Sequence, residues 1–514
     1  MAEVRLRRAE PEPPRERGGQ ASDRDRSAIE HLSHYASARY ISESLLLLRG
    51  FALACLLGPA GFGLWSQVKL VLIFLQYGQL GVHEAMQREV PFALGRGEVR
   101  KAREIAGNSL GFSLSSALAS GLLILGAAAL LANGSPAVRL TWMILAGLNI
   151  VSQLYWYVVL KLRAENRLTL TSQVLVGFAA LSTLLGLLGA ARWGVAGFLA
   201  GCGISHVLAI AWAGGGRSPL PRPRWERKAL GELLADGFPI MTSGALVLLL
   251  CNMDKLAIWW LLTREDLGIY SLQSYLLLSV LLLPESISAV LYPRLMERAA
   301  RAGETGHLVE YLTRPSLIMG HFLCPALGVL FLSFHLPVRW LLPEYTPAIA
   351  PAMVLIAALY PLALSRVPFT ILVALGRQRR LLALTGFSIV LGGASIWTLL
   401  VTGCGLVGAA AGAALSFAIY GALCLGAAMV ALRVRGRQAA SFLGQLTLPF
   451  LAAGAGVIVA LVLVPSSPGS MLGDLASTIL RCLVMLVPAG ALAFWAHRNL
   501  RLFERRPLGG GDGR

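Results

Sequence analysis

Long stretches almost free of charged residues recur along the whole chain, for example residues 110–131, 168–190 and 389–401. A run of about 20 apolar residues is long enough to cross the hydrocarbon core of a bilayer, and it must do so as a helix because lipid offers exposed backbone groups no hydrogen-bond partner. Charged residues form only 14% of the 514, against roughly a quarter in soluble domains. The chain is therefore predicted to be an all-α polytopic membrane protein.

Apolar length and loop charge together define the individual spans. We predict about fourteen transmembrane helices, near residues 34–57, 63–87, 105–131, 138–160, 168–190, 194–213, 237–262, 267–292, 316–334, 347–375, 381–401, 405–432, 447–464 and 477–496.

Basic residues gather in alternate loops, and this pattern accounts for the formal net charge of +18. The intervening loops carry only Arg139, Arg192, Arg264 and Arg339. Because cytoplasmic loops are enriched in Lys and Arg, the basic loops and both termini are expected on the cytoplasmic side of a bacterial inner membrane. The charge thus indicates membrane orientation, and nucleic acid is not an expected partner. The basic set lies within residues 88–103, 161–167, 217–228, 294–314, 377–380, 433–437 and 498–514.

Little in the sequence suggests bound metal, cofactor or catalysis. The seven cysteines lie in or beside apolar segments without CxxC spacing, which is typical of small buried side chains. There is no GxxxxGK[ST] phosphate loop, no HExxH and no GxSxG motif. We expect no metal site, no cofactor and no enzymatic activity. Residues 1–33 mix both charge signs with Pro and Gly, which favours a disordered cytoplasmic tail over a signal peptide.

Twelve of the predicted helices form two similar halves. Residues 56–66 align without gaps on residues 261–271, with identical glycines at Gly63 and Gly268 and identical serines at Ser66 and Ser271. At the far ends of the halves, residues 194–205 parallel residues 405–416, and each segment carries a Gly-x-x-x-Gly step that allows close helix contact.

Six helices bring each half back to its starting side of the membrane, so the repeats are parallel. Such lobes enclose a central cavity that opens to either side in turn. The predicted division is an N-lobe at 34–213, a linker at 214–236, a C-lobe at 237–432, an extra helix pair at 433–496 and a cytoplasmic tail at 497–514.

Several motifs carry a family resemblance over most of the chain. The turn Leu57-Gly-Pro-Ala-Gly-Phe-Gly-Leu-Trp, the stretch Tyr77-Gly-Gln-Leu-Gly, Asn252-Met-Asp-Lys255 and Tyr292-Pro-Arg294 resemble polysaccharide transporters, the Wzx-type flippases of the multidrug/oligosaccharidyl-lipid/polysaccharide exporter superfamily. The resemblance implies alternating access and a cargo of undecaprenyl-diphosphate-linked oligosaccharide for surface polysaccharide biosynthesis, such as O-antigen or exopolysaccharide. It also implies a polysaccharide polymerase and export machinery as partners.

Charged side chains within spans are costly and by default mark function. Arg49, Lys69 and Lys255, with Asn252, are the predicted cargo-binding residues, because a diphosphate needs fixed positive charge and hydrogen-bond donors in place of water. For Arg49 an ion pair with Asp254 is the alternative. Arg366 is expected at the inner membrane interface.

Four embedded carboxylates are candidates for binding a coupling H⁺ or Na⁺, or else for balancing nearby cations: Glu43, Glu84, Asp254 and Glu285. Three other functions remain open at this point: a cation-coupled exporter of drugs or small amphiphiles, a lipid II flippase, and a membrane-embedded glycosyltransferase or polymerase. The short extracytoplasmic loops near 335–346 and 465–476 weigh against the last of these.

Overall fold

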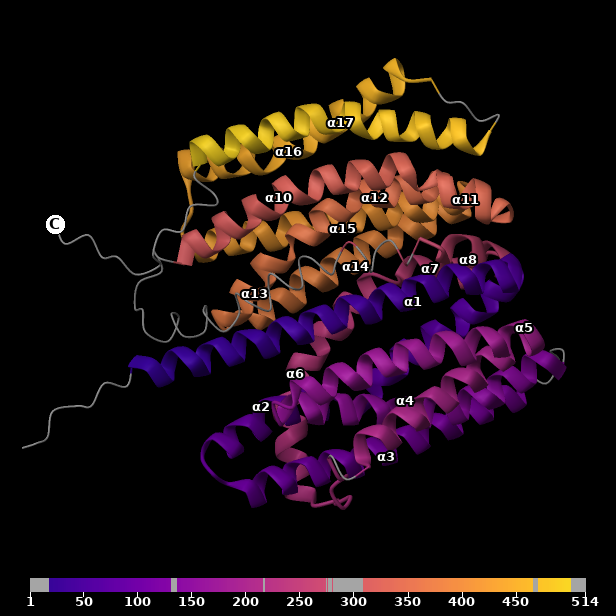
Figure 1. Ribbon diagram of the computed structural model, residues 1–514, viewed down its shortest axis with the longest axis vertical. Helices are drawn as coiled ribbons and strands as arrows, with labels where there is room; N and C mark the ends of the chain where they lie inside the picture. The colour runs from indigo at the N-terminus through magenta and orange to yellow at the C-terminus, as the bar shows by residue number, and fades with distance from the viewer. Residues whose placement is uncertain are drawn as a thin grey trace, which may run out of the picture.

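A computed structural model describes residues 18–130, 136–215, 218–273, 275, 280, 308–465 and 470–500, and every regular element within these residues is a helix (Figure 1). The N-terminal elements are α1 (Gly18–Leu75), η1 (Gln76–Gln79), α2 (Val82–Gly95), α3 (Val99–Leu130), α4 (Pro136–Ala164), α5 (Leu168–Gly214), α6 (Arg227–Leu250), α7 (Met253–Leu261) and α8 (Arg264–Ser271). The C-terminal elements are α10 (Leu308–Ser333), α11 (His335–Leu341), η3 (Pro343–Ala348), α12 (Ile349–Leu364), α13 (Arg366–Ala374), α14 (Gln378–Val401), α15 (Gly405–Ala431), α16 (Gly436–Leu463) and α17 (Met471–Leu500).

Eleven stretches of the described chain are long and apolar enough to cross a membrane. Two of them, His34–Gln79 and Leu168–Gly214, have 46 and 47 residues, which at 1.5 Å per residue is about twice the thickness of the hydrocarbon core. Non-helical backbone interrupts the first at Gly58 and the second at Trp193 and Gly194, so each holds two spans. The protein is a multi-pass membrane protein, and its all-α polytopic fold is the one predicted.

The helices form two groups that diverge from a shared contact region (Figure 1). In one group α1, α3, α4 and α5 pack on one another, and in the other α10, α12, α14 and α15 do so, with α16 and α17 packed on the outside against α10. Helix α6 runs between the groups and contacts both α2 and α14. The boundaries of the predicted lobes, 34–213 and 237–432, remain a prediction.

The predicted glycine contacts are confirmed. A Cβ atom added at Gly201 would lie 2.4 Å from the Leu185 carbonyl oxygen, and one added at Gly197 would lie 2.1 Å from the Gly189 oxygen. In the second half, a Cβ at Gly412 would lie 2.7 Å from the backbone nitrogen of Ile396. Because only a hydrogen fits at such distances, these glycines let α5 fold back on itself and let α15 lie against α14.

Three predicted helices are broken inside the membrane region, which the apolar pattern did not reveal. The helix predicted at 63–87 is interrupted by left-handed backbone at Leu80 and Gly81, with φ of 50° and 90°. The helix predicted at 237–262 divides into α6 and α7 at Cys251 and Asn252, and the one at 347–375 divides at Ser365. Broken helices within a membrane are tolerated where they border protein or a cavity.

The N-terminal region also differs from expectation. Helix α1 begins at Gly18, within the segment 1–33 that was expected to be disordered. The last proline before α1 is Pro14. No proline therefore prevents the first transmembrane helix from extending in the N-terminal direction as far as Gly18. Residues 1–17 lie outside the described part of the chain.

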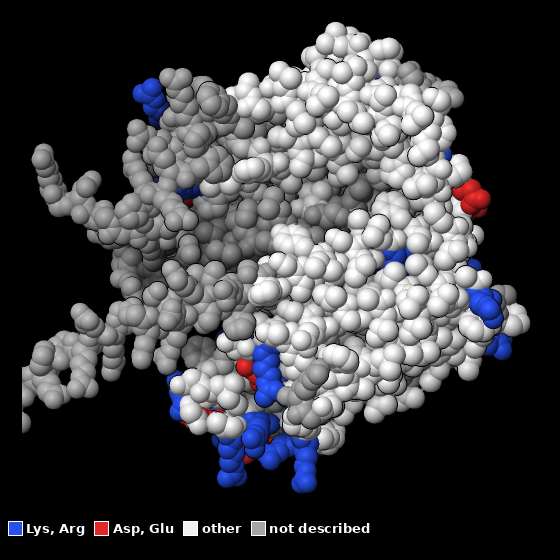
Figure 2. Space-filling view, in the orientation of Figure 1, with Lys and Arg blue, Asp and Glu red and all other residues white. Residues whose placement is uncertain are grey.

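Helix α17 is fastened to the C-terminal group by a buried polar cluster. The Asp474 carboxylate, 1% exposed, accepts a hydrogen bond from Trp340 Nε1 at 3.1 Å and lies 3.3 Å from His335 Nε2. On the face seen in Figure 2, the middle of the described surface is almost free of charge, whereas Lys and Arg gather at its margins.

Candidate functional site: a cationic cavity between the helix groups

A cavity of about 650 Å³ lies where α1, α2, α6, α7 and α13 meet. Its wall includes Lys69 from α1, Glu84 from α2, Lys255 from α7 and Arg366 from α13. Among the described lining residues, cations outnumber carboxylates three to one. The site therefore favours an anion.

The break between α6 and α7 positions Lys255. Asn252, with φ −133° and ψ 1°, is the residue just before α7, and its side chain donates to the Leu248 carbonyl at 2.9 Å. The Lys255 ammonium donates to the Cys251 carbonyl at 3.2 Å and to Asn252 Oδ1 at 3.3 Å. The Cys251 carbonyl is available because the helix ends there. Lys255 is thus held at the cavity wall, with only 5% of its surface exposed.

Asp254 lies behind Lys255. One of its carboxylate oxygens lies 3.6 Å from the Lys255 ammonium, and the other accepts a hydrogen bond from the Tyr270 hydroxyl at 2.8 Å. Asp254 is 2% exposed and is not among the residues that line the cavity. This arrangement fits the charge-balancing role better than the ion-coupling role.

Lys69 faces Lys255 across the cavity region. Its ammonium lies 4.9 Å from the centre of the Tyr275 ring, in a cation–π contact. Coulombic repulsion from Lys255 and Arg49 acts on this ammonium, and Glu43 attracts it. An anion bound in the cavity would reduce the repulsion among these cations.

Aromatic rings form much of the remaining wall. Phe62, Trp65, Tyr77, Tyr275 and Phe369 all line the cavity, and Phe62 packs against Tyr275 with their centroids 6.3 Å apart. The cavity thus combines fixed positive charge with flat apolar surfaces. This lining suits a ligand that carries an anionic group together with rings whose substituents form hydrogen bonds.

Arg366 was not among the predicted cargo-binding residues. It was expected at the inner membrane interface, and the structure shows that it lines the cavity at the start of α13. The predicted helix divides at Ser365, directly before Arg366, so the direction of this side chain could not be extrapolated from an unbroken helix. Its charge within an apolar span was a signal that could have found it.

Arg49 does not line the cavity. Its guanidinium donates to Ser182 Oγ at 2.8 Å and lies 5.4 Å from the centre of the Phe198 ring, and both of these residues belong to α5. The alternative role for Arg49, an ion pair with Asp254, is not formed either, since that carboxylate contacts Tyr270 and Lys255. Glu43 lies half-buried on α1 outside the lining set, and Glu285 lies outside the described residues.

We expect Arg49→Ala to reduce stability more than cargo binding. Loss of the hydrogen bond to the fully buried Ser182 leaves a buried hydroxyl with one partner fewer, which costs about 1–3 kcal/mol. Thermal unfolding of the purified protein in detergent measures this cost. Ser182→Ala is the matched partner variant, and the double variant should lose less than the sum of the two single changes. An unchanged melting temperature together with lost transport would return Arg49 to the cargo site.

Near the turn 57–63, two glycines allow the two helix groups to come into close backbone contact on that side of the cavity. A Cβ at Gly63 would lie 1.9 Å from the Arg264 carbonyl oxygen, and a Cβ at Gly268 would lie 1.9 Å from the Pro59 carbonyl oxygen. The Tyr345 hydroxyl adds a hydrogen bond to the Ala54 carbonyl at 3.1 Å. The two groups of helices are therefore in backbone contact on the side where the sequence places the extracytoplasmic loops.

Two groups of membrane helices beside a charged internal cavity form a fold that is also seen in solved transporters. The fold is similar to that of the lipid II flippase MurJ in an inward closed conformation, with a TM-score of 0.68, 14% identity, and coverage of 91% of this chain and 99% of that one. It is also similar to an inward-facing multidrug resistance MATE family transporter of the MOP superfamily (TM-score 0.63, 15% identity, coverage 79% and 98%). A third similar structure is that of a mutant of the Vibrio cholerae MATE transporter VcmN (TM-score 0.60, 16% identity, coverage 81% and 98%).

Residues 113–345 match the model of a family described as "Polysaccharide biosynthesis protein". The description of this family agrees with the resemblance noted in the sequence motifs. No curated protein matches the chain.

Proposed function

We propose that the chain is a flippase that moves an undecaprenyl-diphosphate-linked oligosaccharide from the cytoplasmic to the periplasmic leaflet of a bacterial inner membrane. The observation that carries the proposal is the set of cations, Lys69, Lys255 and Arg366, that line one cavity between the two helix groups. The family match to polysaccharide biosynthesis and the likeness in fold to a lipid II flippase favour the same function.

The chemistry of the cargo suits this cavity. A diphosphate that leaves water must regain its hydrogen bonds and charge compensation, and ammonium and guanidinium groups supply both. Sugars present hydroxyl groups and apolar ring faces, which the aromatic wall and Asn252 complement. Lys69 and Lys255 hold the diphosphate in this proposal, and Arg366 joins them.

Alternating access supplies the mechanism. With the glycine contact at Gly63 and Gly268 closed, the cargo enters from the cytoplasmic side, and rocking of the two lobes then separates this contact and releases the cargo outward. Glu84, in the cavity wall, is the carboxylate best placed to bind a coupling H⁺ or Na⁺. Both termini lie in the cytoplasm, and a polysaccharide polymerase takes up the delivered cargo.

Deletion of the gene followed by lipid extraction tests the proposal. We expect complete lipid-linked repeat units to accumulate on the cytoplasmic leaflet, because synthesis continues while translocation stops. Complementation with the intact gene should clear them. Normal glycan lipids with altered drug sensitivity would instead identify an exporter of small amphiphiles, and accumulation of lipid II would identify a lipid II flippase.

A further inference from the structure

Residues 218–226, which lead into α6, lie along α3 and are held there by hydrogen bonds. The Arg224 backbone nitrogen donates to the Gly107 carbonyl at 3.0 Å, the Glu226 nitrogen donates to Asn108 Oδ1 at 2.8 Å, and Trp225 Nε1 donates to Ser115 Oγ at 2.9 Å. A Cβ at Gly111 would lie 2.1 Å from the Arg224 carbonyl oxygen. The connection is therefore a fixed part of the surface, and a pocket formed against it has a defined shape.

Such a pocket, with a volume of about 530 Å³, lies between this segment, the α2–α3 turn and the end of α4. It is separate from the central cavity, with which it shares no lining residue. Its size is within the range of small-molecule sites. Leu94, Val99 and Leu220 line it and are 37%, 48% and 40% exposed, so the pocket has apolar side chains at its opening.

The polar part of the pocket is cationic. Lys161, Arg103 and Arg167 line it with one carboxylate, Glu165. That carboxylate is already neutralised, because its oxygens lie 2.9 Å from the Lys161 ammonium and 3.5 Å from Arg167 Nε. Lys161 is 6% exposed and also donates to Ser218 Oγ at 2.8 Å. Arg103 makes no ion pair within the described part of the chain, so its charge is available to a ligand.

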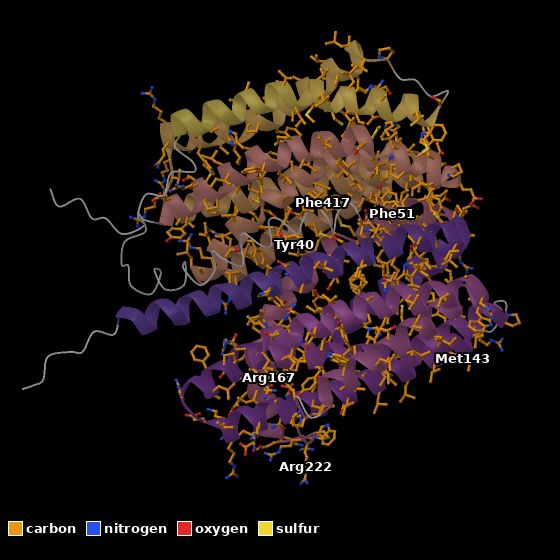
Figure 3. All side chains as sticks on the ribbon, viewed as in Figure 1. Tyr40, Phe51, Met143, Arg167, Arg222 and Phe417 are labelled. Atoms are coloured by element: carbon orange, nitrogen blue, oxygen red, sulfur yellow. The ribbon has the colours of Figure 1, made fainter. Side chains whose placement is uncertain are left out.

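The pocket lies at the margin of the membrane-facing surface. Arg222, in the connecting segment, is at the outer edge of the α1–α5 group, away from the C-terminal helices (Figure 3). Lys and Arg side chains gather along this same edge (Figure 2). The sequence places these basic loops at the cytoplasmic interface. A ligand that reaches the pocket there meets cations beside exposed apolar side chains.

We propose that this pocket binds the phosphate headgroup of an anionic glycerophospholipid in the cytoplasmic leaflet. Arg103 and Arg167 contact the phosphate, and Leu94, Val99 and Leu220 contact the glycerol and the first acyl carbons. Basic pockets between helices on the cytoplasmic side are suited to such headgroups. Free phosphate and the phosphate of a polyprenyl carrier share the anionic chemistry but lack the paired acyl chains.

Native mass spectrometry of the intact protein in detergent tests the proposal with phosphatidylglycerol as the probe. We expect retention of phosphatidylglycerol in preference to zwitterionic phosphatidylethanolamine, and a loss of affinity of about tenfold or more in Arg103→Gln/Arg167→Gln, since each basic group near a lipid surface contributes appreciably to binding. Leu94→Glu, which places a carboxylate at the exposed opening, should weaken retention to a similar degree without disturbing buried packing.

The matched control is Arg96→Ala/Arg222→Ala, which removes the same charge from exposed positions outside the pocket. Unchanged retention in this control supports a defined site, and an equal loss would overturn it as general surface attraction. Full displacement of phosphatidylglycerol by inorganic phosphate, or tighter binding of undecaprenyl phosphate than of phosphatidylglycerol, would overturn the lipid assignment. Retention unaffected by Arg103→Gln/Arg167→Gln would overturn the site itself.

Discussion

Lys255→Ala is expected to abolish most glycan export while the protein still inserts and folds. A charge-assisted contact is worth about 1.5–3 kcal/mol, so cargo affinity should fall by about tenfold to a hundredfold. Lys255 is 5% exposed and its ammonium donates to the Cys251 carbonyl at the end of α6, so no neighbouring cation can take its place without moving. Surface polysaccharide and lipid-linked repeat units, measured in a deletion strain complemented with each variant, report the effect.

The controls for this prediction separate charge from structure. Lys228→Ala removes a lysine from an exposed position at the start of α6 and should leave export unchanged. Lys255→Gln keeps a donor for the Cys251 carbonyl but lacks the charge, so it should melt close to the native protein and still fail in export. Full export by Lys255→Gln would show that the cavity does not recognise its cargo through this charge.

Gly63→Leu is expected to prevent the extracytoplasmic side of the cavity from closing. The new Cβ would meet the Arg264 carbonyl oxygen at 1.9 Å, and this overlap can be relieved only by separating the turn from α8. Overpacking of this kind costs about 1–3 kcal/mol or more, enough to shift a two-state equilibrium about fivefold to a hundredfold toward the outward-open form.

Labelling from outside the cell measures this shift. Ser66 lines the cavity and is 5% exposed, so Ser66→Cys in a chain without its native cysteines should react with a membrane-impermeant maleimide only when the contact opens. We expect little labelling with Gly63 present and strong labelling in Gly63→Leu, together with lost export. Gly126→Leu is the matched control, because nothing lies within 4 Å of a Cβ at that position. Equal labelling in the three chains would contradict the closing role of the glycine contact.

The internal repeat led to this contact, but it did not predict it. Gly63 and Gly268 were matched only as equivalent positions in two halves, and the structure packs the two equivalent turns against each other. The alignment shows that two turns are alike, whereas their contact depends on how the halves are placed around a common axis. The family motifs and the repeat thus predicted the helical architecture, but they did not predict that the two turns at Gly63 and Gly268 contact each other.

For the embedded charges too, the sequence predicted some features and only the structure showed the others. Lys69, Lys255, Asn252 and Glu84 lie at one cavity, and their positions within spans were the reason to select them. Arg49 was selected by the same rule, yet its guanidinium faces Ser182 inside the N-terminal group. Arg366 was set aside, yet it lines the cavity. Because a charged side chain is costly in lipid, each embedded charge is expected to contact a partner or a cavity. The sequence does not indicate which partner that is.

The sequence alone determined the membrane class, the number of spans and the expected orientation, because these depend on the length of apolar runs and on loop charge, which are properties of neighbouring residues. Tertiary structure alone decided which charges share a cavity. That outcome depends on the breaks at Gly81, Asn252 and Ser365, where the predicted helices are interrupted. It depends also on the packing between segments that are far apart in the chain, for which local hydropathy carries no information.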